Sequence, residues 1–143
     1  MELKQLYREI VNEHNLHPEY KRELPGANAV LNGVNPSCGD DITLQMKVKD
    51  GVVKEAAFTG SGCAISQASA DMMCALVEGR TAAEAQRLGD IFMRMIRGEA
   101  SPEEIEELDE AAALQDISHM PARVKCAVLG WRTMQAILSE TNT

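Results

Sequence analysis

A cysteine and a carboxylate stand two positions apart in the segment Asn-Pro-Ser-Cys-Gly-Asp-Asp, residues 35–41. The proline and the glycine of this segment disfavour helix and strand, so we expect Cys38 and Asp40 to lie on a loop. An accessible thiol beside a carboxylate is suited either to binding a metal ion or to thiol chemistry. The segment therefore marks the first place where this chain could do chemistry.

Cys63 and Cys126 supply two further thiols, each at the end of an expected element. Side chains at element ends can meet even when they are far apart in the sequence. The spacing of the three cysteines matches no short zinc-finger pattern. Together with Asp40, however, Cys38, Cys63 and Cys126 form a four-ligand tetrahedral set that zinc accepts, with the carboxylate as the ligand most easily exchanged.

Structural roles for the same residues remain open at this point. Cys63 could fill a small space at a strand end, and Cys126 could be a buried helical cysteine. Asp40 could stabilise an Asx turn. In favour of chemistry, the free N–H groups of a helix N-terminus would stabilise a Cys63 thiolate, and Arg123 and Lys125 would do the same for Cys126.

The other reactive or charged side chains are expected to be structural. Cys74 lies deep in an apolar helical segment, which predicts a buried core residue. His119 is expected on the surface, and His14 and His17 are expected to cap the end of a helix, where the dipole favours a cation. The acidic run at residues 103–110 is expected to be the solvated face of a helix.

Hydrophobic periodicity and turn residues divide the chain into a helix, a small sheet and four more helices. Alternating apolar residues predict a strand at 42–49, and Asp50-Gly51 predicts a tight hairpin after it. A glycine-rich turn is expected at residues 60–63. The expected helices are 3–14, 64–78, 82–98, 102–114 and 122–139, and the expected strands are 29–34, 42–49 and 52–59.

This order predicts an α+β fold in which a small three-stranded antiparallel sheet carries helices on one face. The 143 residues suit a single domain, 1–143, and the apolar content of 45% suits a packed core. The formal net charge of −8 argues against nucleic-acid binding, which usually needs a basic surface.

The N-terminal sequence Met-Glu-Leu-Lys-Gln-Leu begins no long apolar run and leads to no small-residue cleavage site, so no signal peptide is expected. No stretch approaches the ~20 apolar residues that span a membrane. We therefore expect a cytoplasmic protein. In a reducing compartment, four cysteines indicate metal binding or catalysis rather than disulfides.

Three segments of the sequence resemble the SufU branch of the IscU/NifU-type iron–sulfur cluster assembly proteins. They are NPSCGDDITLQMKV, FTGSGCAISQASADMM and PARVKCAVLGW, and each contains one of the three cysteines described above. Lys125 stands where IscU-type proteins carry a histidine before the third cysteine. Residues 120–125 also differ from the Leu-Pro-Pro-Val-Lys signal for a dedicated Hsp70-type chaperone. Both features favour the SufU branch.

The resemblance implies one zinc ion bound by Cys38, Asp40, Cys63 and Cys126. It also implies that a pyridoxal-phosphate cysteine desulfurase of the SufS type is the partner and passes persulfide sulfur to Cys38. On this hypothesis the chain is a zinc-dependent sulfurtransferase, and a downstream iron–sulfur assembly scaffold receives the sulfur.

Two alternatives stand beside this hypothesis. Three cysteines and one aspartate could instead ligate a [2Fe–2S] cluster, which would make the chain a scaffold for cluster assembly and transfer. A zinc module that activates the desulfurase by docking alone is the third possibility. A lysine rather than a histidine at position 125 favours the sulfurtransferase over the scaffold.

Overall fold

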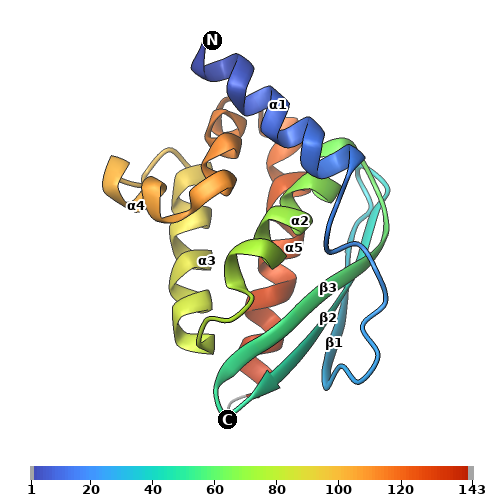
Figure 1. Ribbon diagram of the computed structural model, residues 1–143. Coiled ribbons are helices and arrows are strands. Elements are labelled where there is room, and N and C mark those ends of the chain that lie inside the picture. Colours follow the sequence, from blue (N-terminus) through green and yellow to red (C-terminus); the bar gives the residue numbers. More distant parts are fainter. Residues whose placement is uncertain (1, 142–143) are drawn as a thin grey trace.

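The computed structural model describes residues 2–141, in which helices cover one face of a three-stranded antiparallel sheet (Figure 1). This arrangement confirms the expected α+β fold. The helices are α1 (Leu3–Leu16), α2 (Ala64–Val77), α3 (Ala82–Ile96), α4 (Pro102–Glu107) and α5 (Pro121–Thr141), the strands are β1 (Ala29–Asn35), β2 (Asp40–Lys49) and β3 (Val52–Ser61), and a 3₁₀ helix, η1 (Asp109–His119), lies between α4 and α5.

The sheet has the order β1-β2-β3, so each strand pairs with its neighbour in the sequence. Asp50 and Gly51 join β2 to β3 with positive φ angles of 54° and 73°. Two consecutive positive φ angles are the geometry of a type I′ hairpin turn, which confirms the prediction at this dipeptide. Every second residue of β2 from Ile42 to Val48 is buried in the core, as the pleat of a strand requires.

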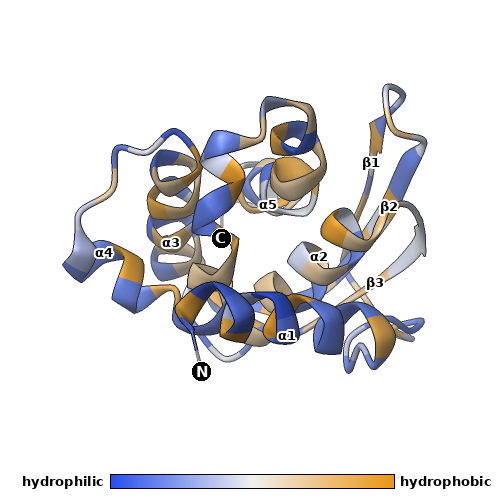
Figure 2. Cartoon of the chain, turned by 90° about the horizontal axis from the view of Figure 1, so that it is seen from above, coloured by the Kyte–Doolittle hydropathy of each residue, from blue (hydrophilic) through white to orange (hydrophobic). Residues whose placement is uncertain are grey.

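The hydrophobic core lies between the sheet and the helices α2, α3 and α5. α2 contacts β3, α5 contacts β1 and β2, and α3 packs against α5 on the side away from the sheet (Figure 1). The ring of Phe92 on α3 stacks on Trp131 of α5, with the ring centroids 4.1 Å apart. By contrast, α1 has no buried residue, and Figure 2 shows it as a largely hydrophilic helix.

The segment between α1 and β1 first pairs with the outer edge of β3 and then reaches the face of the sheet that carries no helix. The backbone N–H of Phe58 in β3 donates to the carbonyl oxygen of Tyr20 at 2.9 Å. Further along, the backbone N–H of Leu24 donates to Oε1 of Gln45 in β2 at 3.1 Å. Gln45 points away from the helices because its neighbours in β2 point toward them. This segment therefore shields part of the face that carries no helix.

All three strands reach further than predicted at one end of the sheet. Asp40 is the first residue of β2 and pairs with Asn35 of β1, so it does not lie on a loop. Ser61 is the last residue of β3, so the turn expected at residues 60–63 is largely a strand end. Gly60 permits this extension: its φ is 125°, and a Cβ there would overlap a backbone carbonyl of β2.

The prediction of a single helix at residues 102–114 is wrong. α4 ends at Glu107, Asp109 takes a positive φ of 52°, and the chain continues as the 3₁₀ helix η1. A 3₁₀ helix has about 3.0 residues per turn, so its buried face recurs at every third position. Four buried residues recur at that period, Leu108, Ala111, Leu114 and Ile117, and Ala113 is buried beside them.

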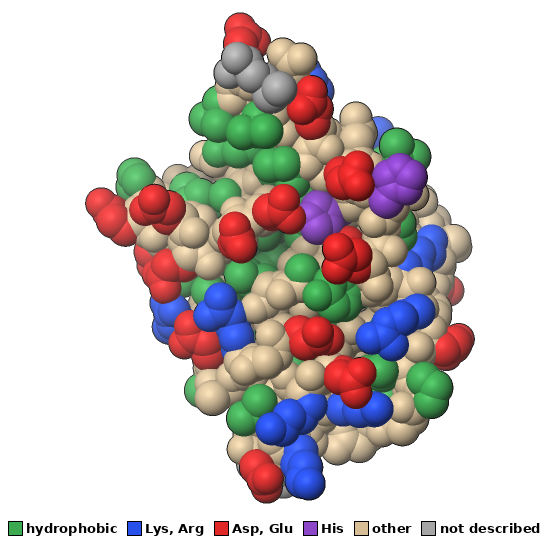
Figure 3. Space-filling model, viewed as in Figure 1, with side chains coloured by type: hydrophobic (Ala, Val, Ile, Leu, Met, Phe, Trp, Pro, Cys, Tyr) green, Lys and Arg blue, Asp and Glu red, His purple; other side chains and the backbone are tan. Residues whose placement is uncertain are grey.

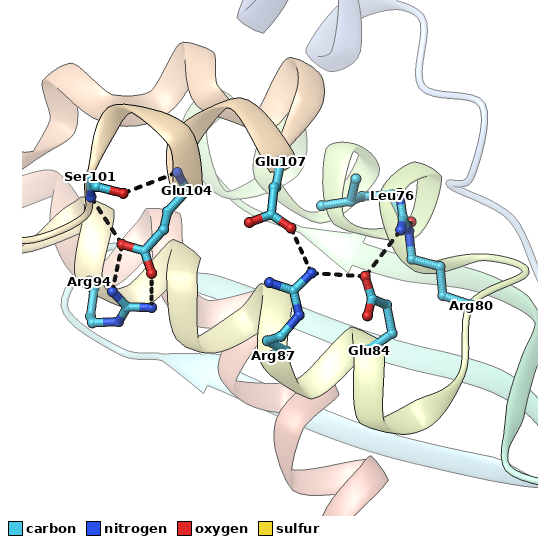
Figure 4. Close-up of polar contacts among 8 residues, drawn as sticks. All are labelled: Leu76, Arg80, Glu84, Arg87, Arg94, Ser101, Glu104 and Glu107. Atoms are coloured by element: carbon cyan, nitrogen blue, oxygen red, sulfur yellow. Dashed lines mark hydrogen bonds and ion pairs between the residues drawn. The ribbon is translucent and has the colours of Figure 1, made fainter.

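The acidic run at 103–110 is not simply a solvated face, because it forms ion pairs with α3 (Figure 4). Arg94 donates to both carboxylate oxygens of Glu104, at 2.7 and 2.6 Å. Arg87 donates to Glu107 at 2.7 Å. The bond from Arg94, together with the capping box that Glu104 forms with Ser101, lowers the pKa of Glu104 to about 2. These contacts fix α4 against α3.

The surface of the helical side carries charged side chains of both signs, intermixed with hydrophobic ones (Figure 3). Between residues 2 and 141, no helix combines the length and the apolar character needed to cross a bilayer.

Candidate metal centre

The four predicted ligands come from three segments that meet at one end of the sheet. Cys38 lies in the turn between β1 and β2, and Asp40 begins β2. Cys63 lies between β3 and α2, and Cys126 lies in the second turn of α5. Figure 1 shows the β1–β2 turn, the β3–α2 connection and the start of α5 at the end of the molecule over which α1 passes.

Three of these residues place their ligand atoms close together. Sγ of Cys38, a carboxylate oxygen of Asp40 and Sγ of Cys126 all lie within 4.8 Å of one another. Zinc bonds to sulfur are about 2.3 Å long, so two sulfur ligands of one tetrahedral ion stand about 3.8 Å apart. The ligand atoms lie within 4.8 Å of one another, so small side-chain adjustments would bring them to that spacing, and thiols with a carboxylate suit zinc chemically. The three residues therefore fit a shared zinc ion.

Asp40 is fully buried, and its carboxylate is held by several donors. Oδ1 accepts from the backbone N–H of Cys63 at 2.9 Å and from Oγ of Ser66 at 3.0 Å. Oδ2 accepts from Nδ2 of Asn35 at 3.1 Å. Burial by itself raises the pKa of Asp40, but these bonds and one from the Cys126 thiol outweigh it, so the pKa is lowered. Asp40 is thus an ionised carboxylate that can bind a cation.

Cys63 is the N-cap residue of α2, as its position before the helix predicted. Its sulfur accepts from the backbone N–H of Ser66 at 3.5 Å. The group of three within 4.8 Å does not include this sulfur. Its side chain nevertheless reaches the thiol of Cys126, since a hydrogen bond between the two contributes to the pKa of Cys126. Cys63 therefore borders the group and contacts two of its members.

The three cysteines differ in how far solvent and partners can reach them. Cys38 is exposed, Cys63 is half-buried and Cys126 is buried. Burial is the main reason that the pKa of Cys126 is raised, and hydrogen bonds with Cys38, Asp40 and Cys63 add to the effect. Without a cation, Cys126 keeps its proton at neutral pH. Cys38 is the thiol that another protein can approach.

The remaining candidates behave as structural residues, with one correction. Cys74 is buried in the core, which raises the pKa of its thiol well above the ordinary value. His119 is exposed, as expected. His14, however, does not act as a helix cap: its Nδ1 bonds to Oδ2 of Asp71 at 2.7 Å and its Nε2 to Oε1 of Glu110 at 2.9 Å. It joins α1 to α2 and η1, and Figure 3 shows acidic side chains around the histidines.

Three residues around Asp40 were not found from the sequence. Asn35 and Ser66 bond its carboxylate, and Gly62 leaves room for it, because a Cβ there would lie 2.6 Å from Oδ1. Each stands within three positions of a cysteine of the site. That proximity is the signal which could have pointed to them.

Comparison with known proteins points to the same family as the sequence resemblance. Residues 6–140 match the family described as NifU-like N terminal domain. The iron-sulfur cluster assembly scaffold protein IscU of Thermotoga maritima is 39% identical over 140 residues, which cover 98% of this chain and 97% of that protein. The zinc-dependent sulfurtransferase SufU of Bacillus subtilis is 38% identical over 130 residues, which cover 91% and 87% of the two proteins.

A solved structure has the same fold. It is that of a Fervidobacterium islandicum protein whose name assigns it to the SUF system as an iron-sulfur cluster assembly scaffold. The two chains are 30% identical and superpose with a TM-score of 0.86, over 94% of this chain and 97% of that one. The likeness therefore includes every element that contributes to the candidate metal centre.

Proposed function

This chain belongs to the NifU-like N-terminal domain family of iron–sulfur cluster assembly proteins, and we propose that it is a zinc-dependent sulfurtransferase. Its proposed partner is a SufS-type cysteine desulfurase, and the proposed zinc ligands are Cys38, Asp40, Cys63 and Cys126. The observation that carries the proposal is the group formed by Cys38, Asp40 and Cys126, whose ligand atoms lie within 4.8 Å of one another. The name of the Bacillus subtilis relative supports both the metal and the reaction.

The donor set explains why a cation belongs there. Bound zinc would supply the positive charge that keeps thiol ligands deprotonated. Cys126 has the greatest need of that charge, because its surroundings otherwise raise its pKa. Asp40 contributes a negative charge that its hydrogen bonds already stabilise. The chain thus offers one carboxylate that is ready for a cation and thiols that require one.

Cys38 is the proposed sulfur acceptor because it is the exposed thiol of the group. Its thiolate would attack the outer sulfur of a persulfide carried by the desulfurase cysteine. A new S–S bond forms on Cys38, the S–S bond of the donor breaks, and the donor cysteine leaves as a thiolate. The buried Cys126 cannot be reached in this way.

A scaffold that assembles a [2Fe–2S] cluster is the second candidate. The names of the Thermotoga maritima and Fervidobacterium islandicum relatives favour it. The same three cysteines and one aspartate would then ligate iron, with the cluster as cargo rather than as a resident cofactor. Lys125, which lies directly before Cys126, adds a cationic ammonium rather than a further imidazole ligand, and this favours the sulfurtransferase.

The test is stimulation of a SufS-type desulfurase that is supplied with cysteine. The wild-type chain is expected to accelerate turnover and to carry one extra sulfur atom on Cys38 by mass spectrometry. Cys38→Ala should abolish both effects and remain folded. The control is Cys74→Ala, which removes a cysteine remote from the site and should retain both. Equal stimulation by Cys38→Ala and the wild type would refute the carrier role and favour activation by docking alone.

A further inference from the structure

Ser66 contacts two of the proposed ligands at once. It lies in the first turn of α2 and is fully buried. Its backbone N–H donates to Sγ of Cys63 at 3.5 Å, and its Oγ lies 3.0 Å from Oδ1 of Asp40. The same Oγ is 3.0 Å from the carbonyl oxygen of Cys63. Because a carboxylate is the stronger acceptor, the single hydroxyl proton is directed mainly to Asp40.

Asn35 supports the same carboxylate from the opposite side. It is the last residue of β1 and is 6% exposed. Its Nδ2 donates to Oδ2 of Asp40 at 3.1 Å and lies 3.7 Å from Sγ of Cys126. Its carbonyl oxygen accepts from the backbone N–H of Cys38 at 3.3 Å. Asn35 and Ser66 together therefore touch all four proposed ligands without being ligands themselves.

The two oxygens of Asp40 are left in different states by these contacts. A carboxylate oxygen accepts about two hydrogen bonds. Oδ1 receives two donors, from Cys63 and Ser66, so its lone pairs are both engaged. Oδ2 receives one amide donor, from Asn35. The thiol of Cys126 also bonds the carboxylate, and a cation would replace the hydrogen of that thiol. The carboxylate can thus offer one oxygen, not two.

The space around Oδ1 is as restricted as its hydrogen bonding. A Cβ at Gly62 would lie 2.6 Å from Oδ1 of Asp40 and 2.5 Å from Oγ of Ser66. The backbone of the β3–α2 connection therefore closes over this oxygen. Oδ1 is thus enclosed by the backbone at Gly62, the N–H of Cys63 and the hydroxyl of Ser66.

We propose that Ser66 is a positioning residue that makes Asp40 a one-oxygen ligand by engaging Oδ1 and turning Oδ2 toward the metal. The proposal rests on the proposed zinc site. A one-oxygen carboxylate keeps the ion four-coordinate, whereas a two-oxygen carboxylate would raise the coordination number. The backbone bond from position 66 to Cys63 does not depend on the side chain. Ser66→Ala therefore removes only the contacts of the hydroxyl, with Oδ1 of Asp40 and with the carbonyl oxygen of Cys63.

The experiment compares Ser66→Ala with the wild-type chain in two measurements that do not involve the desulfurase. Zinc affinity, measured by competition with a chromophoric chelator, should fall about 10- to 100-fold, as is usual when a residue that orients a ligand is lost. In the cobalt(II)-substituted protein, the visible ligand-field bands should weaken, because an ion that gains a second carboxylate oxygen leaves tetrahedral geometry.

Ser69→Ala is the matched control, because Ser69 is also a fully buried serine of α2. Its hydroxyl donates to the carbonyl oxygen of Ala127 at 2.6 Å and accepts from Nε1 of Trp131 at 3.0 Å, so it bonds none of the proposed ligands. Ser69→Ala should lower thermal stability and leave the zinc affinity and the cobalt spectrum unchanged. An equal loss of affinity in both variants would show a general effect of α2 packing and would overturn the proposal.

The outcomes separate this inference from the function on which it rests. Wild-type affinity and an unchanged cobalt spectrum in Ser66→Ala would overturn the positioning role, even if the wild-type chain stimulates a desulfurase. A wild-type chain that binds zinc but does not stimulate the desulfurase would contradict the sulfurtransferase function and leave the positioning role intact. A wild-type chain that binds no zinc would contradict both.

Discussion

Gly62 has no space for a side chain, because the Asp40 carboxylate and the Ser66 hydroxyl occupy the position of a Cβ. Gly62→Ala is therefore expected to push Asp40 away from the cysteines. We expect zinc affinity to fall by at least the factor of about 10 that is typical for the loss of a ligand-orienting contact. Chelator competition measures the affinity, and circular dichroism checks that the fold is retained.

Gly98→Ala provides the control for that substitution. Gly98 has a positive φ of 74°, and nothing lies within 4 Å of its missing Cβ. The substitution should cost about 1 kcal/mol of stability, because alanine is strained in this conformation, and should leave zinc affinity unchanged. The importance of Gly62 would be disproved if both variants bound zinc like the wild type.

Cys74 is the cysteine that should not matter for the metal. Its thiol is fully buried among core side chains. Cys74→Ser places a hydroxyl there, which we expect to cost about 1–3 kcal/mol because a buried hydroxyl needs a new hydrogen-bond partner. Urea unfolding measures the cost, and metal analysis should show the wild-type zinc content. Loss of zinc in this variant would place Cys74 in the site.

The sequence allowed the chemistry of single residues to be predicted better than their surroundings. The set of Cys38, Asp40, Cys63 and Cys126 stood out because three thiols and a carboxylate at element ends form a donor set that zinc accepts. Asn35 and Ser66 did not stand out, because amide and hydroxyl side chains occur at many turns and helix starts. Only the folded chain shows that both point at one carboxylate.

At the scale of elements, polar contacts help to hold α1, beside Ile10 and Val11, which pack against the core. His14 bonds Asp71 on α2 and Glu110 on η1, and Tyr7 accepts from Gln115 of η1 at 2.8 Å. The bond to Asp71 is the main cause of the raised pKa of His14, followed in that direction by the bond to Glu110, while burial opposes both. Because both ring nitrogens bond carboxylates, which only accept hydrogen bonds, both must carry a proton, and the ring is an imidazolium.

This arrangement predicts a pH dependence of stability with a definite sign. Because the pKa of His14 is raised in the folded chain, its contribution is complete below the ordinary value of 6.5 and is lost as pH rises through the folded value. Thermal midpoints of the wild type should therefore fall across that window relative to those of His14→Gln. Both proteins contain the same thiols, so the difference between their thermal midpoints reports the change at position 14.

His17→Gln is the control for the histidine experiment. His17 is exposed, so its replacement should leave the pH profile like that of the wild type. The pH range of this comparison is roughly 6 to 9, around the unperturbed histidine pKa. If the thermal midpoints of His14→Gln and the wild type change in parallel across this range, the protonated His14 bridge is excluded.

The elements were predictable wherever a standard period and a standard cap agreed. The hairpin at Asp50 and the start of α4 at Ser101 are examples, because a turn dipeptide and a capping box each determine the local backbone. The 3₁₀ helix η1 was missed because its first buried positions, Leu108 and Ala111, also suit an α-helix. Only the continuation to Leu114 and Ile117 at the same spacing separates the two periods.

At the scale of the whole molecule, the site borders the hydrophobic core, and Asp40 and Cys126 are themselves fully buried. The core cluster among the described residues contains none of Cys38, Cys63 and Cys126. We therefore expect the metal-free chain to remain folded, with an unchanged far-ultraviolet circular dichroism spectrum after chelation. Bound zinc should stabilise the folded chain by about 2.7 kcal/mol when the free zinc concentration is 100 times the dissociation constant. The thermal midpoint should rise accordingly. If the chain unfolds when zinc is removed by a chelator at about 25 °C, the fold depends on the metal and this expectation is wrong.

The arrangement of the whole chain followed from the order of its elements, because strands grouped early and helices grouped late leave few ways to bury one face of a small sheet. The convergence of three segments at one end of the sheet could not be read from spacing, since it depends on how α5 crosses β1 and β2. The resemblance to a known family supplied that part of the prediction.

The metal content of the aerobically purified wild-type chain separates the two proposed functions. A zinc-dependent sulfurtransferase is expected to be colourless, with one zinc ion per chain and no iron. A brown protein that carries iron and acid-labile sulfide would instead identify a scaffold, and a chain without bound metal would contradict both functions.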